Sequence, residues 1–296
     1  MAKAPKTGRT MKAAYKAAQE GPGQIVKAGE LIHAHFPKGA SPSLTARRVL
    51  ALMMGAAAGD GWRKQTHRIT KKEIRQAHKG NDRIEAILDE VAGIRLTMDG
   101  ISSRGRPARI RGALVRIVEE ADEADSAWVE FDFYDDVRRL LGASDVYATM
   151  NRAALLAFRS KYTVTLYELG CLLSGRHDKT QRFTVEDLRR KVGVEDGKYR
   201  DWTDFNRFVL QQARTEIDQL AHFLMTITEE RKGRKVVAVT LGFWPKDEAG
   251  MIEAAKELER HRSGRRARRD GTVEQIAPYQ SDLEDFTGRQ IEGDEG

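Results

Sequence analysis

The apolar positions of residues 160–244 follow a helical period first and an extended period later. Residues 160–175 predict a core helix, because large side chains recur there at helical spacing: Tyr162, Leu166, Leu169, Leu172 and Leu173. A short strand comes next. A second helix is expected after Thr184, a residue suited to cap a helix N-terminus, with Leu188 and Val192 facing the core and Gly193 ending the helix.

A longer amphipathic segment begins near Trp202 and predicts a third helix. Its expected core face is Phe205, Phe208, Val209, Ala213, Ile217 and Leu220. The opposite face carries Arg207, Gln211 and Arg214, which are spaced by four and three residues and so form one exposed stripe. Aromatic residues at helical spacing indicate a core rather than a surface that stacks on bases.

Two runs rich in β-branched residues then predict a hairpin around Gly233. Its tip is basic: Arg231, Lys232, Arg234 and Lys235. A basic hairpin directly after a pair of helices is the element order of a winged helix. The second helix of such a pair can enter a DNA major groove about 12 Å wide, while the hairpin reaches flanking phosphates.

The residue types suggest separate roles in DNA binding. Arg207 can pair with guanine, and Asn206 or Gln211 with adenine, while Arg214 extends the same stripe. The turn residues Lys198 and Arg200 and the four cations of the hairpin tip suit phosphate contacts. Exposed arginines are often merely solvated, so the prediction rests on their concentration in one module.

Residues 25–150 repeat the same order of elements, and this predicts an internal duplication. A core helix is expected within residues 43–59, and Ile69, Thr70, Ile74 and Arg75 stand 114 residues before their counterparts Phe183, Thr184, Leu188 and Arg189. We therefore predict an α+β, mainly helical fold with tandem winged-helix domains at 25–150 and 151–245. A basic flexible tail (1–24) and a charged, partly disordered tail (246–296) complete the expected organisation.

The first domain is expected to contact protein rather than DNA. Its third helix, predicted to start at Asn81 or Asp82, presents Glu85, Asp89 and Glu90, which phosphate would repel. The predicted strands 108–119 and 127–133 offer a surface for homodimerisation.

Composition indicates a polyanionic binding partner and a reducing cellular compartment. The chain has 296 residues, enough for two domains, and 51 Lys plus Arg against 44 Asp plus Glu give a net charge of +7. The single Cys171 excludes an intramolecular disulfide. No apolar run is long enough to span a membrane. These features predict a soluble cytoplasmic protein.

Motifs for catalysis and cofactors are scarce, and we expect no enzyme activity, cofactor or metal. Phosphate-binding glycine loops, paired cysteines and a serine nucleophile elbow are missing from the sequence. One motif, His33-Ala34-His35, matches the metal-binding pair of nucleases that nick replication origins with a tyrosine. The surrounding residues predict a helix or loop instead of a central strand, and Tyr162 and Tyr167 fit a core, so nicking is the less favoured alternative.

The stretch 160–244 resembles the C-terminal domain of plasmid replication initiators of the two-winged-helix Rep type, the iteron-binding initiators. The resemblance is carried by Ser160, Tyr162, Leu166-Tyr167-Glu168-Leu169, Phe183-Thr184, Leu188, Trp202, Asp204-Phe205, Arg207, Val209-Leu210, Ala213, Glu216-Ile217 and Lys232-Gly233-Arg234-Lys235-Val236. It extends more loosely to about residue 25. Two departures are Thr165, where the family usually has arginine, and Asp218, where it usually has asparagine.

The resemblance implies a DNA-binding initiator that acts on double-stranded DNA in the bacterial cytoplasm, in association with plasmid or nucleoid DNA. Such proteins bind direct repeats at a plasmid origin as monomers, assist opening of the duplex for a host helicase and control copy number, with a host initiator as a further partner. Dimers formed through the first domain repress the protein's own promoter. A transcriptional regulator of the same fold is the nearest alternative.

Overall fold

The structure is a computed structural model that describes residues 8–37, 41–60, 64–77, 84–102, 104–119 and 128–272. The chain divides into one compact unit, Met1–Glu259, and a second unit, Arg260–Gly296. The described part of the second unit contains helix α13 (Arg265–Arg269). No helix of the described residues is long and apolar enough to cross a membrane.

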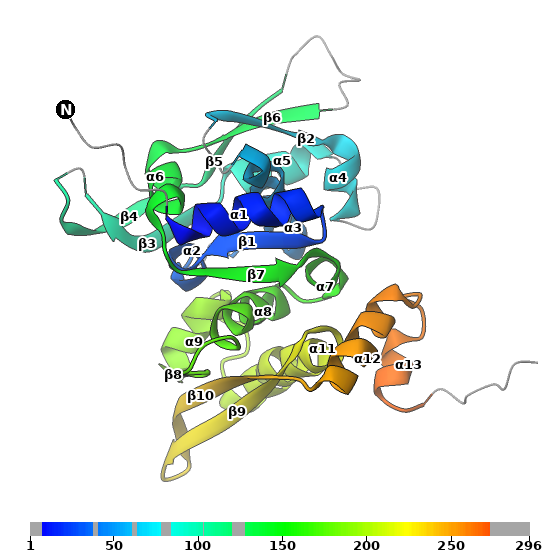
Figure 1. Cartoon of the computed structure of the whole chain (residues 1–296). Coiled ribbons are helices and arrows are strands. Elements are labelled where there is room, and N and C mark those ends of the chain that lie inside the picture. Colours follow the sequence, from blue (N-terminus) through cyan, green and yellow to red (C-terminus); the bar gives the residue numbers. More distant parts are fainter. Residues whose placement is uncertain are drawn as a thin grey trace, which may run out of the picture. The chain divides into compact units, whose positions relative to one another are not determined.

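The second half of the larger unit forms a winged helix (Figure 1). Its helices are α8 (Lys161–Leu173), α9 (Val185–Val192) and a third helix in three parts: α10 (Trp202–Phe205), the π-helix η2 (Asn206–Gln211) and α11 (Gln212–Leu220). Strands β8 (Thr180–Thr184), β9 (Phe223–Lys232) and β10 (Lys235–Pro245) form an antiparallel sheet in the order β8-β10-β9.

The first half contains a second winged helix with the same element order. Its helices are α3 (Leu44–Ala57), followed by the short η1 (Ala58–Asp60), then α4 (Lys71–Gln76) and α5 (Ile84–Ala92). Its strands β2 (Thr66–Thr70), β5 (Val115–Val118) and β6 (Trp128–Phe133) pair in the order β2-β6-β5. In both sheets the last strand lies between the other two, which confirms the predicted tandem winged helices. A hairpin of β3 (Arg95–Ile101) and β4 (Pro107–Ala113) is inserted between α5 and β5.

Thr70 and Thr184, the threonines that correspond in the two copies, both cap the helix that follows them. The hydroxyl of Thr70 accepts a hydrogen bond from the backbone N–H of Glu73 at 3.0 Å and caps α4. The hydroxyl of Thr184 accepts one from Asp187 at 3.1 Å and caps α9, which ends at Gly193 in the left-handed conformation. These bonds satisfy N–H groups that a helix start leaves without partners, so the local sequence fixes both strand-to-helix junctions.

The N-terminal segment is more ordered than its charge suggested, and the prediction of a flexible tail is wrong for residues 9–20. They form helix α1 (Arg9–Glu20), which buries Thr10, Ala14 and Ala17. The Thr10 hydroxyl donates to Ser144 Oγ at 3.0 Å. These three small side chains lie on one face of α1 and are enough to pack it against the protein. The positive charge of the segment had suggested a solvated tail instead. Residues 1–7 lie outside the described residues.

Around α1 lie the elements that frame the first winged helix. Strands β1 (Gln24–Ala28) and β7 (Tyr147–Asn151) pair antiparallel. Helix α2 (Gly29–His33) follows β1, and α6 (Asp135–Ala143) precedes β7. Helix α7 (Arg152–Ala157) ends at Phe158, which has extended backbone, and α8 begins again after Ser160. A break at residues 158–160 therefore separates α7 from α8, the first helix of the second winged helix.

The start of the expected charged C-terminal tail is a helix that packs on the rest of the larger unit. Residues 248–259, expected in a charged tail, form helix α12 (Glu248–Glu259), which contacts α11 and α7 and buries Ala254 and Glu257. Glu257 is only 4% exposed. The prediction of disorder for residues 273–296 falls outside the described residues.

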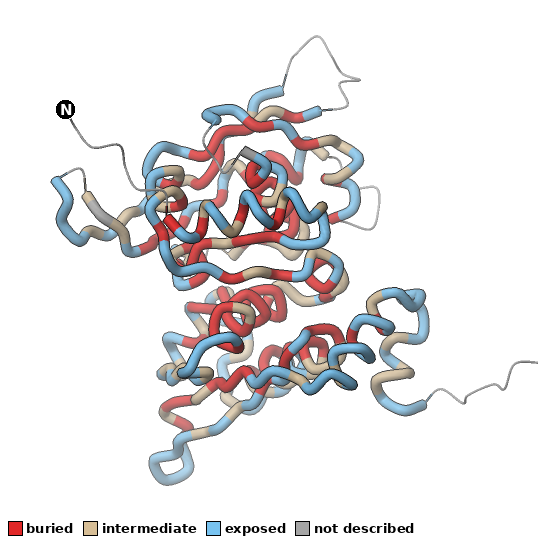
Figure 2. Tube along the Cα trace, viewed as in Figure 1, coloured by how far each residue is buried: buried red, intermediate tan, exposed pale blue. Residues whose placement is uncertain are grey.

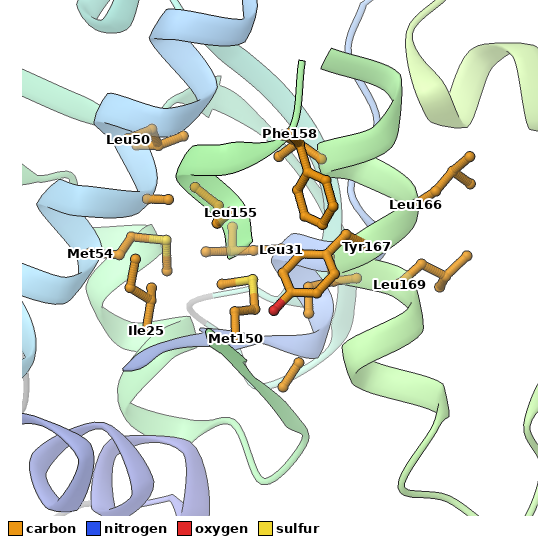
Figure 3. Packing of buried hydrophobic residues seen from close by; sticks show 14 of the residues in the cluster. Ile25, Leu31, Leu50, Met54, Met150, Leu155, Phe158, Leu166, Tyr167 and Leu169 are labelled. Atoms are coloured by element: carbon orange, nitrogen blue, oxygen red, sulfur yellow. The ribbon is translucent and has the colours of Figure 1, made fainter. Parts of the chain in front are cut away.

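Helix α8 is the centre of the larger unit, since other elements cover it on both sides (Figure 2). It contacts α2, α3 and β7 of the first half and α9, α11 and β10 of the second half. Tyr167 shows the packing most clearly (Figure 3): its ring lies 4.8 Å from Phe158 and stacks at 5.9 Å on Phe223. The Tyr167 hydroxyl accepts a hydrogen bond from the Asn151 N–H at 2.9 Å.

Buried polar groups also join the two halves through α8. Glu168 is 8% exposed, and Lys27 Nζ of β1 donates to both of its carboxylate oxygens at 2.8 Å. The Arg47 guanidinium of α3 donates to Thr165 Oγ1 and, at 3.4 Å, to the Val192 carbonyl. Lys191 of α9 donates to the carbonyl oxygens of Ile32 and Ala34. Lys27 thus binds the Glu168 carboxylate directly, while Arg47, which binds Thr165, and Lys191 feel the charge of this carboxylate in the same buried region.

Burial lowers the pKa of Lys191 to about 7, an effect that the Glu168 carboxylate only partly offsets and that Lys27 and Arg47 reinforce. The unfolded chain keeps this amine protonated up to its ordinary pKa near 10.5. Between these values the unfolded state binds more protons, so stability should rise with pH. Relative to Lys191→Met, the wild type should gain about 2 kcal/mol of unfolding free energy between pH 7 and pH 9 in urea titrations.

The matched control for this experiment is Lys198→Met. Lys198 is exposed, and its hydrogen bond to Glu195 raises its pKa, so it stays protonated in both states throughout the window. Its difference from wild type should not change with pH. A Lys191→Met difference that is equally flat would mean that Lys191 remains charged when folded.

Candidate nucleic-acid interface

The third helix of the second winged helix presents a different face from the one that periodicity predicted. Phe205, Val209, Leu210 and Ala213 are fully buried, as expected for most of them. Phe208, predicted to be core, is instead 43% exposed, and Leu210, not predicted, is buried. The wider turn of η2 explains the change, because a π-helix has more residues per turn than the α-helical spacing used for the prediction.

The predicted stripe on this helix is only partly formed. Arg207 and Arg214 are exposed, whereas Gln211 is half-buried and donates its side-chain amide to Asn206 Oδ1 at 3.2 Å. Arg214 lies 3.5 Å from the Asp218 carboxylate one turn later. Asn206 and Gln211, both proposed as adenine readers, are therefore bonded to each other.

Ion pairs and hydrogen bonds hold the turn that precedes this helix, residues 195–200. Lys198 pairs with Glu195, which also binds Lys161, and Arg200 is exposed. The Arg189 guanidinium donates to the Tyr199 carbonyl and, at 2.6 Å, to the Lys198 carbonyl. Tyr199 has a φ of +47°, a conformation uncommon for a residue with a side chain. The turn is held in one shape beside the start of the helix.

The hairpin of β9 and β10 carries the four predicted cations at its exposed tip (Figure 2). Lys232 pairs with Lys235 across a two-residue turn in which Gly233 has a φ of +62°. Arg231 is held at 2.5 Å by Glu229, which also accepts a hydrogen bond from the Trp202 indole at 2.9 Å. Among the described residues, Lys232, Arg234, Lys235, Arg200 and Arg207 form no ion pair. Their charges remain available to an external anion.

The first winged helix has a basic surface that the sequence analysis missed. Its third helix α5 exposes Glu85, Asp89 and Glu90, as expected, although Glu90 is used internally and accepts hydrogen bonds from Ser43. The inserted β3–β4 hairpin, however, carries exposed arginines that pair with no acid of the described chain: Arg95, Arg104, Arg106, Arg109 and Arg111. The high density of arginine over residues 95–111 was the sequence signal that could have predicted this basic surface.

The histidine pair does not adopt the arrangement of the nicking enzymes. His33 ends helix α2, and His35 makes an isolated bridge to Thr97. Burial lowers the pKa of His33 to about 4, and nearby Lys191 and Arg176 contribute. Tyr162 and Tyr167 are 7% and 0% exposed. Over the part of the chain that is described, no group of three or more His, Cys, Asp or Glu side chains is placed to hold a metal ion.

Two winged helices with a basic hairpin define a protein of the winged-helix DNA-binding class. The family described as "Initiator Replication protein, WH1" matches residues 24–171, and the one described as "Initiator Rep protein, WH2" matches residues 184–243. Together these matches cover more than half of the chain, which therefore belongs to the initiator Rep proteins and is a DNA-binding replication initiator.

One solved structure supports this fold. A crystal structure of the Pi initiator protein in complex with iteron DNA matches with a TM-score of 0.53 and 18% identity, over 77% of this chain and 99% of that one. Selenomethionine derivatives of domains 2 and 3 of RctB match with a TM-score of 0.36 and 12% identity, over 75% and 86% of the two chains. A search of curated protein sequences gives no significant match.

Proposed function

We propose that this protein initiates replication of a bacterial plasmid by binding direct repeats at its origin and assisting local opening of the duplex. The observation that carries this proposal is the second winged helix, where exposed Arg207 and the unpaired cations of the hairpin tip belong to one compact module. The similar Pi initiator was crystallised with iteron DNA, which supports repeats as the target.

Within this proposal the contacts divide into two kinds. Arg207, Asn206, Gln211 and Arg214 lie on the third helix and face the bases, whereas Lys198, Arg200, Arg231, Lys232, Arg234 and Lys235 bind phosphates. The hydrogen bond between Asn206 and Gln211 makes Arg207 the principal reader, since its guanidinium is unpaired. The arginines of β3–β4 add phosphate contacts from the first domain.

Dimers formed through the first domain repress the protein's own promoter in this scheme, and the host initiator and helicase act at the opened origin. The protein works without cofactor or catalysis in the cytoplasm. Incubation with supercoiled origin DNA and Mn²⁺ should leave neither a nick nor a covalent protein–DNA adduct. Either product would instead support a nicking enzyme.

Mapping the protected sequence on the protein's own plasmid tests the proposal directly. Several direct repeats, each of about two helical turns, beside an AT-rich tract are expected. A single inverted repeat with no protected direct repeats would mean a transcriptional regulator of the same fold.

Arg207→Ala should weaken binding to the mapped site by roughly 1–3 kcal/mol and relax base preference at one position. Lys232→Ala should weaken binding to specific and random DNA alike and reduce the salt slope by about one. Lys256→Ala, an exposed cation on α12, is the control and should change neither. If Arg207→Ala and Lys232→Ala reduce specific and random binding equally, the division of roles is wrong.

A further inference from the structure

Phe208 is a large apolar side chain exposed on the helix that carries Arg207. It is 43% exposed, while the neighbouring Phe205 and Val209 are fully buried. Isolated exposed hydrophobic residues are common on protein surfaces and need no explanation by themselves. The surroundings of Phe208 distinguish it, because they hold the ring in place and place cations beside it.

Two side chains fix the Phe208 ring. Tyr199 stacks on it with ring centroids 5.9 Å apart and an interplanar angle of 28°. The Arg207 guanidinium carbon lies 5.2 Å from the ring centroid. Tyr199 is itself fixed, since its carbonyl accepts the Arg189 hydrogen bond and its ring meets Tyr162 edge-on at 6.3 Å. A ring held this way loses little conformational entropy when it meets a ligand.

The charges around the ring indicate what that ligand is. Lys198 and Arg200, on either side of Tyr199, are exposed, as is Arg207. An apolar edge within a cationic surface suits a polyanion that also offers an apolar group. The major groove of DNA has one such group, the C5-methyl of thymine, and phenylalanine is among the side chains that contact it.

We propose that Phe208 is a specificity-determining residue that packs against the C5-methyl group of a thymine beside the base contacted by Arg207. The inference rests on the proposed function, in which this helix enters the major groove. It adds an apolar element to a reader otherwise composed of hydrogen-bond donors. It also gives a function to the Phe208 ring that the π-helical turn leaves exposed.

Deoxyuridine provides the test, because it keeps the hydrogen bonds of thymine and lacks only the methyl group. In the mapped site each thymine is replaced singly, and the dissociation constant of the full-length protein is measured. Wild-type affinity should fall about fourfold at one position, the effect of exposing one methyl group. Phe208→Ala should bind the thymine and deoxyuridine sites equally well at that position, and Phe208→Leu should keep part of the preference.

Leu224→Ala is the matched control, since Leu224 of β9 is also 43% exposed but lies on the sheet. It should retain the wild-type response to deoxyuridine. The inference is overturned if wild type is insensitive at every thymine, or if Phe208→Ala keeps the full response. In that event, protection of direct repeats in the mapped site would leave the proposed function intact, and an Arg207→Ala variant with relaxed base preference would keep this helix as the reader of bases.

Discussion

Glu168→Gln is expected to lower the free energy of unfolding by about 3–5 kcal/mol, the cost of removing one partner from a buried ion pair. Glu168 is the carboxylate that Lys27 binds through both oxygens, and Arg47 and Lys191 lie in the same buried region. Glutamine keeps the shape and some hydrogen bonding but removes the charge. Arg47 and the largely buried Lys27 would then lack this counter-charge.

Urea denaturation at neutral pH measures this effect, and Glu230→Gln is the matched control. Glu230 also pairs with an arginine, Arg182, at 2.8 Å, but both side chains are more than half exposed. Exposed pairs contribute about 0–1 kcal/mol, so this variant should be nearly as stable as wild type. Equal small losses in the two variants would show that the buried cluster contributes no more than a surface pair.

Tyr167→Ala is expected to cost about 3–5 kcal/mol, as for other large aromatic side chains removed from a core. The side chain is 0% exposed and packs between Phe158 and Phe223, so its removal leaves a cavity where the two halves meet α8. Tyr167→Phe keeps the ring and leaves the Asn151 N–H without its acceptor, at a cost of about 1–3 kcal/mol.

The control for these two variants is Tyr15→Ala on α1, where the side chain is 52% exposed. Its effect should stay within about 0.5 kcal/mol. The ordering Tyr167→Ala, Tyr167→Phe, Tyr15→Ala separates the contribution of the ring from that of the hydroxyl. If Tyr167→Phe were as damaging as Tyr167→Ala, the hydroxyl rather than ring packing would hold this part of the core.

Local patterns were sufficient for most of the second winged helix. The spacing of Leu166 and Leu169 predicted α8, Thr184 and Gly193 marked the ends of α9, and Gly233 marked the hairpin turn. Each of these signals acts within a few residues of the chain, through side-chain periodicity, capping bonds or backbone conformation. Such interactions can be inferred without knowing what lies opposite.

The errors have different physical causes: contact between residues distant in sequence, one departure from α-helical geometry, and a strand pairing that was not predicted. Helix α1 is ordered because Thr10 and its small neighbours find a surface near Ser144, and no local signal contains that surface. The π-turn at η2 moved Phe208 out of the core and Leu210 into it. The arginines of β3–β4 were visible in the sequence, but only the strand pairing shows that they belong to one hairpin.

The sequence by itself determined the order of the elements, their repetition in two winged helices and the family to which the chain belongs, because periodicity, caps and turns are local properties. Only the tertiary structure decided how the halves join at α8, where Lys27, Arg47 and Lys191 converge on Glu168 and its neighbours. It also decided which face of the third helix meets solvent. Both depend on packing between segments more than a hundred residues apart or on one wide turn, and neither leaves a periodic trace in the chain.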